Sequence, residues 1–147
     1  MSGNKWQSPL HMAAQKGHNG IVCLLLEQDV DCNEGDSEGL TPLMHAVIGG
    51  FQDVAGSLLA RGARVGATDG QDRSALHWAV VHRREALLRL LLEHWAGDGG
   101  GDERGVVDGY DADGKTPLHA AIEAGFEAGV HVLLEFGADV KSRAGVS

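Results

Sequence analysis

The chain has 147 residues, of which 43% are apolar and 22% charged, as in one ordinary globular domain. Its formal net charge of −9 argues against direct binding of nucleic acid, which needs clustered Lys and Arg to displace counterions. No apolar run is long enough to span a membrane, and the first residues lack the apolar core of a signal peptide.

The two cysteines, Cys23 and Cys32, are too few for a disulfide scaffold and fit a reducing compartment. We therefore expect an intracellular protein, cytoplasmic or nuclear. A disulfide between the two is the less favoured alternative.

The first predicted element is a short helix that begins after Ser8, and the same start recurs along the chain. The four starts read SPLH at 8–11, TPLM at 41–44, SALH at 74–77 and TPLH at 116–119. Ser or Thr before Pro is typical of a helix N-terminus, because the hydroxyl accepts a free amide and the Pro lacks one. These helices are alanine-rich, and Gly17, Gly50 and Gly125 end three of them.

A second helix follows each of these starts, and a turn follows each helix pair. Apolar residues recur at helical spacing in 21–26 and again in 87–92. The sequences DSEG at 36–39 and DADG at 111–114 then predict β-hairpin turns. Two short helices and a hairpin cannot bury their apolar faces alone, whereas stacked copies can.

The unit recurs with a fixed period that is broken once. Ser8, Thr41 and Ser74 are 33 residues apart, whereas Ser74 and Thr116 are 42 apart, which adds nine residues. We place these extra residues in the segment GDGGGDERGV and predict a solvated loop that neither packs nor forms a helix, with a partner contact as the alternative. The predicted units of this single domain, 1–147, are about 4–36, 37–69, 70–111 with a nine-residue insertion near 97–106, and 112–147.

These units resemble the ankyrin repeat, whose pattern reads D-x-x-G-x-T-P-L-H-x-A-A-x-x-G-H, followed by L-L-L-x-x-G-A-D. The fourth copy carries this pattern almost whole, from Asp111 to Gly125 and in VLLEFGADV at 132–140. The resemblance covers residues 4–141. It implies an all-α ankyrin-repeat solenoid of four helix-turn-helix units with β-hairpin loops, which binds a protein or peptide and has no catalytic activity.

The repeated pairing of a hydroxyl with a histidine three residues later has two interpretations. Ser8 and His11, with their equivalents in the third and fourth units, would be proton-transfer pairs if a third group oriented the histidine and a pocket excluded water. The second unit has Met44 instead of the histidine, and no third group is specified. We favour the structural interpretation that the resemblance implies, in which the hydroxyl caps the helix and binds the histidine. The sequence therefore predicts no catalytic residue and no enzyme.

Metal and cofactor sites are not predicted either. The eight histidines and two cysteines contain no C-x-x-C or H-x-x-x-H pair. The segment DVDCNEG at 29–35 begins like a calcium loop, but its glycine comes one residue late and its twelfth position is Leu40. The glycines at 97–101 lack the Lys-Ser/Thr of a phosphate loop.

The resemblance places the partner surface on the hairpin tips and on the exposed ends of the first helices. The candidates that it implies in the first two units are Lys5, Gln7, Gln15, Lys16, Ser37, Glu38, Leu40 and Ile48. Those in the third and fourth units are Gln71, Arg73, Trp78, Val81, His82, Asp113, Lys115 and Glu123. Apolar Leu40, Ile48 and Val81 lie among charges of both signs, as in interfaces with an apolar centre and a polar rim. A merely solvated face is the alternative for each residue, and Trp78 either packs between units or anchors a partner.

Three departures from the pattern carry further expectations. Gly129 stands where the other units have Ile21, Val54 and Leu87, so we expect the fourth unit to pack less well. Arg83 stands where the turn glycine is expected and should strain that turn. The chain also stops where another hairpin should start, from which we expect a fragment of a longer protein.

Two functions follow from the sequence. The first is a monomeric module that binds another protein through its concave face, without a nucleic-acid or membrane partner. The alternative is an intramolecular regulatory or structural domain of a larger protein, such as a transcription or signalling regulator. The acidic charge favours a partner with some basic character. Asn33 matches the asparagine that hydroxylases modify in some members of the family, which adds a possible modification.

Overall fold

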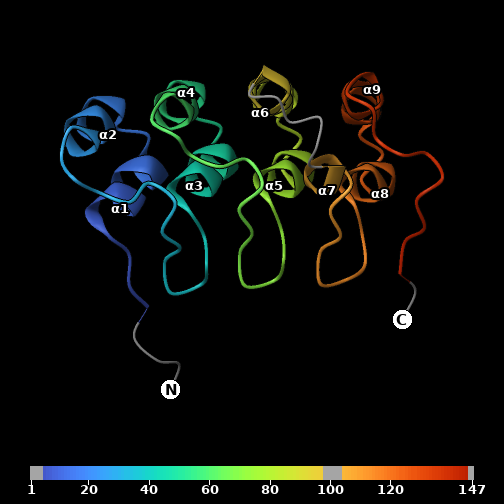
Figure 1. The fold of residues 1–147 in the computed structure, drawn as a ribbon, viewed down its shortest axis with the longest axis horizontal. Helices are drawn as coiled ribbons and strands as arrows, with labels where there is room; N and C mark the ends of the chain where they lie inside the picture. The colour runs from blue at the N-terminus through green and yellow to red at the C-terminus, as the bar shows by residue number, and fades with distance from the viewer. Residues whose placement is uncertain (1–4, 98–103, 146–147) are drawn as a thin grey trace.

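A computed structural model describes residues 5–97 and 104–145, in which pairs of helices stack side by side in two rows (Figure 1). The inner row, next to the projecting turns, contains α1 (Pro9–Lys16), α3 (Pro42–Gly49), α5 (Ala75–Val81) and α8 (Pro117–Glu123). The outer row contains α2 (Asn19–Leu26), α4 (Gln52–Ala60), α6 (Glu85–Gly97) and α9 (Glu127–Glu135). A single helical turn, α7 (Arg104–Val107), precedes α8. This arrangement is the all-α solenoid that the sequence predicts.

The inner helices begin as their sequences indicate. The side-chain oxygens of Ser8, Thr41 and Thr116 accept the backbone N–H three residues later, at 3.3, 3.3 and 3.2 Å. Each of these caps is followed by a proline in the first helical turn. The hydroxyl therefore satisfies an amide that has no partner inside the helix.

The inner helices end at residues with left-handed backbone conformation. Gly17 and Gly50 have φ of 74° and 80°, and Arg83 occupies the equivalent position of the third unit with φ of 55°. A left-handed conformation is unfavourable for a residue with a Cβ atom, so the expected strain at Arg83 is present. The Arg83 guanidinium donates a hydrogen bond to the Ala124 carbonyl of the next helix, which offsets part of that strain.

The apolar core runs along the whole stack, from Leu10 in α1 to Leu133 in α9. Its largest fully buried aliphatic side chains are Leu43, Leu58, Leu76, Leu87, Leu88, Leu91, Leu92 and Leu133. Each outer helix contacts the next outer helix, and each of α1, α3 and α5 contacts the next inner helix. The stability of each pair therefore depends on its neighbours, as in other linear stacks.

The predicted hairpins project from the inner row as narrow turns (Figure 1). The Asp36 N–H donates to the Leu40 carbonyl at 2.9 Å, and Thr68 forms an antiparallel bridge with Ser74. Successive turns are also joined, because the Gly70 N–H donates to the Glu38 carbonyl at 3.3 Å. The spacing of neighbouring turns is thus set by backbone contacts.

The insertion differs from its prediction at its C-terminal end. Residues 98–103 of the predicted loop lie outside the described residues, but residues 104–107 form α7. Val106 and Val107 are buried, so this part of the insertion both packs and forms a helical turn. Val107 follows the buried Val65 by 42 residues, the interval that separates Ser74 from Thr116, and it takes the equivalent place in the core.

Candidate functional site

Each motif histidine is bound at both ring nitrogens. In the first unit, His11 Nε2 lies 2.7 Å from the Glu34 carbonyl oxygen, and Nδ1 lies 3.2 Å from Ser8 N and 2.7 Å from Ser8 Oγ. Because a carbonyl oxygen can only accept, Nε2 carries the proton, and Nδ1 accepts from the amide and hydroxyl of Ser8. His11 is 1% exposed, so these bonds tie the start of α1 to the segment before the next hairpin.

The other two motif histidines also bind a backbone carbonyl further along the chain. His119 Nε2 lies 3.1 Å from the Ser142 carbonyl oxygen, at the position equivalent to Glu34, whereas His77 Nε2 lies 3.0 Å from the Lys115 carbonyl oxygen, at the end of the next hairpin. Burial lowers the pKa of the His77 imidazole, although the hydrogen bond to Lys115 acts in the opposite direction. The neutral form is the one that these bonds require.

We expect the low pKa of His77 to make the protein less stable in mild acid. As the pH falls below about 6.5, the unfolded chain binds a proton before folded His77 does, so the free energy of unfolding decreases. Replacing His77 by Met, the residue that the chain carries as Met44 in the second unit, should reduce this decrease. Urea denaturation of both proteins at pH 7 and pH 5 measures the effect, and equal decreases would contradict the prediction.

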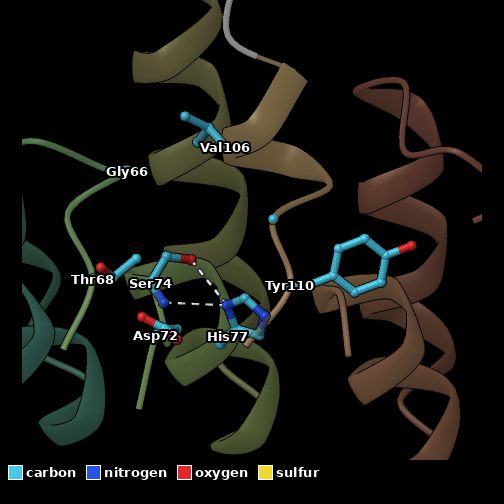
Figure 2. A pocket seen from close by; sticks show the side chains of 8 residues that line it. Gly66, Thr68, Asp72, Ser74, His77, Val106 and Tyr110 are labelled. Atoms are coloured by element: carbon cyan, nitrogen blue, oxygen red, sulfur yellow. Dashed lines mark hydrogen bonds between the residues drawn. The ribbon is translucent and has the colours of Figure 1, made fainter. Parts of the chain in front are cut away.

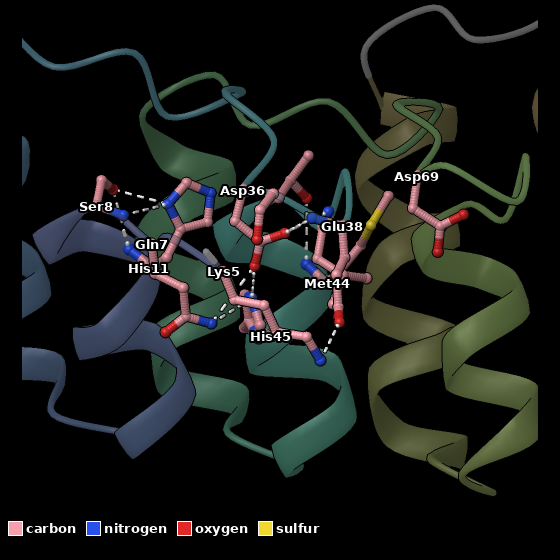
Figure 3. Close-up of polar contacts among 12 residues, drawn as sticks. Lys5, Gln7, Ser8, His11, Asp36, Glu38, Met44, His45 and Asp69 are labelled. Carbon is pink, nitrogen blue, oxygen red and sulfur yellow. Dashed lines mark hydrogen bonds and ion pairs between the residues drawn. The ribbon is translucent and has the colours of Figure 1, made fainter. Parts of the chain in front are cut away.

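The second unit uses a different histidine. Met44 is buried at the motif position, and the following residue, His45, places Nε2 2.8 Å from Asp36 Oδ2 (Figure 3). Gln7 Nε2 lies 3.4 Å from the same carboxylate oxygen. Asp36 and His45 are both buried, so this bond fastens the hairpin to α3, and Gln7 of the first unit adds to it.

The other oxygen of Asp36 organises the hairpin turn. Asp36 Oδ1 accepts the N–H of Glu38 at 2.9 Å and that of Leu40 at 3.0 Å. Burial acts to raise the pKa of the Asp36 carboxyl, but the hydrogen bonds from His45 and from these two amides outweigh it and hold the pKa below its usual value. Asp36 is therefore an ionised acceptor with four donors.

The equivalent aspartates have fewer partners. Asp69 also accepts two amides of its turn and, through Oδ2, the indole N–H of Trp78 at 3.0 Å. Asp111 accepts the amides of its turn at 2.9 and 3.0 Å, and Ala120 stands where His45 and Trp78 supply a further donor. The residue after the motif position thus decides how firmly each hairpin is bound to its helix.

Trp78 lies in a row of flat side chains on the third unit. The Arg73 guanidinium lies 5.1 Å from the centre of the Trp78 ring, and the His82 ring stacks on it at 5.9 Å. Partial burial, and then the nearby charge of Arg84, lower the pKa of His82. The Trp78 ring is half-buried and held on several sides, and part of it remains accessible.

The predicted partner residues differ in exposure. The exposed ones are Lys5, Gln15, Lys16, Ser37, Glu38, Gln71, Val81, His82, Asp113 and Glu123. The partly buried ones are Gln7, Leu40, Ile48, Arg73, Trp78 and Lys115. We call these sixteen residues the strip.

The structure brings several strip residues together in ion pairs. Lys5 Nζ lies 2.9 Å from Glu38 Oε1 (Figure 3), and Lys115 Nζ lies 2.6 Å from Glu123 Oε1. Arg73 approaches Asp113 of the next hairpin at 4.0 Å. Gln15 and Lys16 lie at the end of α1 and belong to none of these pairs or to the Trp78 row.

Two groups were not predicted from the sequence. The first is the hairpin aspartates, which act as acceptors, although an aspartate stands five residues before each of Thr41, Ser74 and Thr116. The second is Arg84, whose Nη2 donates to the Ile48 carbonyl at 2.8 Å while the neighbouring Arg83 donates to Ala124. No local pattern marks these two arginines, because their acceptors are 36 and 41 residues away.

Two further observations concern membrane-spanning helices and the two cysteines. In the part of the chain that the structure describes, no helix is both long and apolar enough to cross a membrane. Cys23 is exposed and Cys32 buried, and neither is joined in a disulfide. The Cys32 thiol lies 3.6 Å from the Arg61 carbonyl oxygen, so it is a packed core residue.

Comparison with known proteins places the whole described stack in one family. A family model for ankyrin repeats in three copies matches residues 2–69 and again 57–144. The chain is 36% identical over 155 residues to the probable E3 ubiquitin-protein ligase XBOS32 of Oryza sativa, covering 90% of this chain and 31% of the ligase. It is 31% identical over 137 residues to the human transient receptor potential cation channel subfamily A member 1, covering 93% of this chain and 12% of the channel.

A third relative is the ankyrin repeat protein nuc-2 of Neurospora crassa, which is 31% identical over 134 residues, or 90% of this chain and 12% of that protein. The chain thus spans less than a third of the length of each of these relatives. Because the family model covers nearly all of the residues that form the helix pairs, this chain belongs to the ankyrin repeat family.

Proposed function

We propose that this chain is a non-catalytic module that binds another protein or a peptide through the strip. The observation that carries the proposal is the row formed by Arg73, Trp78 and His82, next to the half-exposed Val81. Binding energy in interfaces concentrates at Trp, Tyr and Arg side chains, and these residues cost less to order when they are already held in place. We further propose a monomeric, intracellular protein without a direct nucleic-acid or membrane partner.

The charges of the strip indicate that it would select its partner by shape and apolar contact. Its charged residues are Lys5, Lys16, Arg73 and Lys115 against Glu38, Asp113 and Glu123, a net charge of +1. Because the whole chain has a formal net charge of −9, the residues outside the strip carry a net charge of −10. Most strip charges already have a partner within the chain, so a ligand that displaced them would gain little. The acidic remainder favours the approach of a basic partner more than it selects one.

The relatives motivate the second candidate function. Their names include ubiquitin ligases and a channel, and this chain matches only a small part of each. We propose that the matching part supplies contacts and no catalysis. A strip that packs on another segment of a longer polypeptide would make this chain an intramolecular regulatory or structural domain, and that alternative needs the same residues.

Affinity capture with residues 1–147 as bait, read by mass spectrometry, tests the proposal. We expect one or more partners to be lost with the double variant Arg73→Ala/Val81→Ser, with affinity weakened at least about tenfold. The matched control is Ile21→Ser, since Ile21 is 48% exposed and Val81 50%, but Ile21 lies on outer helix α2. Circular dichroism confirms that each variant folds.

The outcomes separate the two candidates. A separate protein that binds the wild type and the control variant, but not the double variant, supports the intermolecular function. Binding by flanking segments of the parent polypeptide alone supports the intramolecular one. Equal loss with the control variant would count against any function of the strip.

A further inference from the structure

A cavity of about 210 Å³ lies between the segment 66–74 and the segment 106–110 (Figure 2). Gly66, Thr68, Asp72, Ser74, His77 and Val106 are among the residues that line it. Pockets for whole small molecules are usually about 300–1,000 Å³, so this cavity has room for one side chain. Three departures from the repeat pattern meet here.

The first departure is Gly66. The equivalent Asn33 accepts the Arg64 N–H at 2.8 Å, and the equivalent Asp108 accepts the Asp139 N–H at 2.9 Å. Each of these side chains fills the space between two units. Gly66 has no side chain and cannot make such a bond, and the Val106 side chain reaches this position instead.

The second departure is the packing of Val106 against Gly66. Val106 belongs to α7, which the insertion brings over Gly66, and a Cβ atom at Gly66 would lie 3.0 Å from Val106 Cγ2. The insertion therefore gives the cavity an apolar wall.

The third departure is Asp72, which stands at the turn position of Gly39 and Gly114. Its φ is 60°, against 83° and 75° for these glycines. A left-handed conformation is uncommon for a residue with a Cβ atom, and such strain collects at binding sites. Asp72 is exposed, and among the described residues its carboxylate takes part in no ion pair.

The cavity is separate from the strip. Asp72 and Ser74 line it, whereas Arg73, between them, lies over the Trp78 ring. Neither Arg73 nor Trp78 is among the residues that line the cavity. Asp72 is the only charged side chain among the lining residues.

The remaining polar groups of the cavity are acceptors. His77 Nε2 donates to the Lys115 carbonyl, so Nδ1 is unprotonated and accepts the Ser74 hydroxyl at 3.1 Å (Figure 2). Ser74 Oγ also faces the His77 N–H in a capping box, which leaves one of its two lone pairs for a donor from outside. The Thr68 hydroxyl and the Asp72 carboxylate add further acceptor oxygens.

We propose that this cavity binds the cationic end of one arginine or lysine side chain of a partner peptide. Both groups carry only donors and a positive charge, which matches an unpaired carboxylate and hydroxyl oxygens beside an apolar wall that packs on the aliphatic stem. The cavity lies outside the strip. A partner bound to the strip would therefore reach the cavity only by extending around the third hairpin.

Titration with acetyl-Gly-Arg-Gly-amide, followed through the amide chemical shifts of the 15N-labelled chain, tests the proposal. We expect shifts centred on Thr68, Asp72 and Ser74, and none of comparable size at Val81. A second titration uses the peptide with citrulline, which has nearly the shape of arginine but no charge, and should give much weaker binding. A lysine peptide shows whether an ammonium group is also accepted.

Substitutions give the decisive comparison. Asp72→Asn removes the charge and tolerates the same backbone conformation, and we expect it to weaken the arginine peptide about fivefold. Asp29→Asn, at an exposed aspartate after α2 that belongs neither to the strip nor to the cavity, is the matched control and should leave the affinity unchanged. Equal affinity for citrulline, equal weakening by both variants, or shifts centred away from the cavity would each overturn the proposal.

Discussion

Replacing Asp36 by alanine should lower the free energy of unfolding by about 3–5 kcal/mol, more than the same change at any other hairpin aspartate. The carboxylate is 7% exposed and accepts two backbone amides, His45 and Gln7. Its removal leaves buried donors without a partner, and desolvated groups of this kind account for most of the cost.

The equivalent aspartates supply the controls. Asp69→Ala should cost less, because Asp69 has one side-chain donor, Trp78. Asp111→Ala should cost least, about 1–2 kcal/mol, since Asp111 is only partly buried and accepts backbone amides alone. Urea denaturation of the three variants measures the series. Equal losses would mean that the turn amides dominate and that the side-chain donors contribute little.

Replacing Gly129 by leucine should destabilise the protein by about 2 kcal/mol, although the repeat pattern calls for an apolar residue there. Gly129 is buried, and a Cβ atom at this position would lie 2.4 Å from Phe126 Cδ2. The Phe126 ring, 7% exposed, thus occupies the space that the buried Val54 and Leu87 fill in the second and third units. Phe126 thus fills the space that the missing side chain would leave, and the weaker packing expected for the fourth unit stays a prediction.

A double variant tests this explanation. The first unit carries His18 and Ile21 at the positions of Phe126 and Gly129. Phe126→His/Gly129→Ile should therefore recover most of the stability that Gly129→Ile loses alone. Thermal denaturation of both single variants and the double variant gives the coupling between the positions. Simple addition of the two single effects would show that the ring and the glycine do not depend on each other.

The position of the Phe126 ring follows from Arg83 in the preceding unit. In the second unit the Phe51 ring lies against Gly17, where a Cβ atom would be 2.6 Å from the ring. Arg83 takes the place of that glycine before Phe126, and its guanidinium lies 5.8 Å from the centre of the Phe126 ring. The larger residue fills the space over the turn, and the ring packs towards Gly129 instead.

Much of the fold was predictable because each unit repeats the same local signals. A capping hydroxyl before proline, as at Thr41 and Thr116, and a glycine after the helix, as at Gly50, act through neighbouring residues only. Their repetition at a constant interval then implies the stack. The packing of Val106 was not predictable in this way, since a helix of a single turn has no hydrophobic period to detect.

The candidate site was predictable only in part. The strip follows from the resemblance, which assigns positions but not their contacts. The bond between Asp36 and His45 depends on how the hairpin lies against α3, and nothing in the eight intervening residues encodes that distance. The cavity beside Asp72 was missed because it needs Gly66 and Val106, which lie 40 residues apart, to meet.

Arg83 and Arg84 have a mechanical consequence for the stack. Arg84 reaches back to the second helix pair and Arg83 forward to the fourth, from adjacent positions in one turn. Bending that moves α3 or α8 away from the third helix pair must stretch one of these two bonds. The third helix pair therefore resists such bending towards either neighbour.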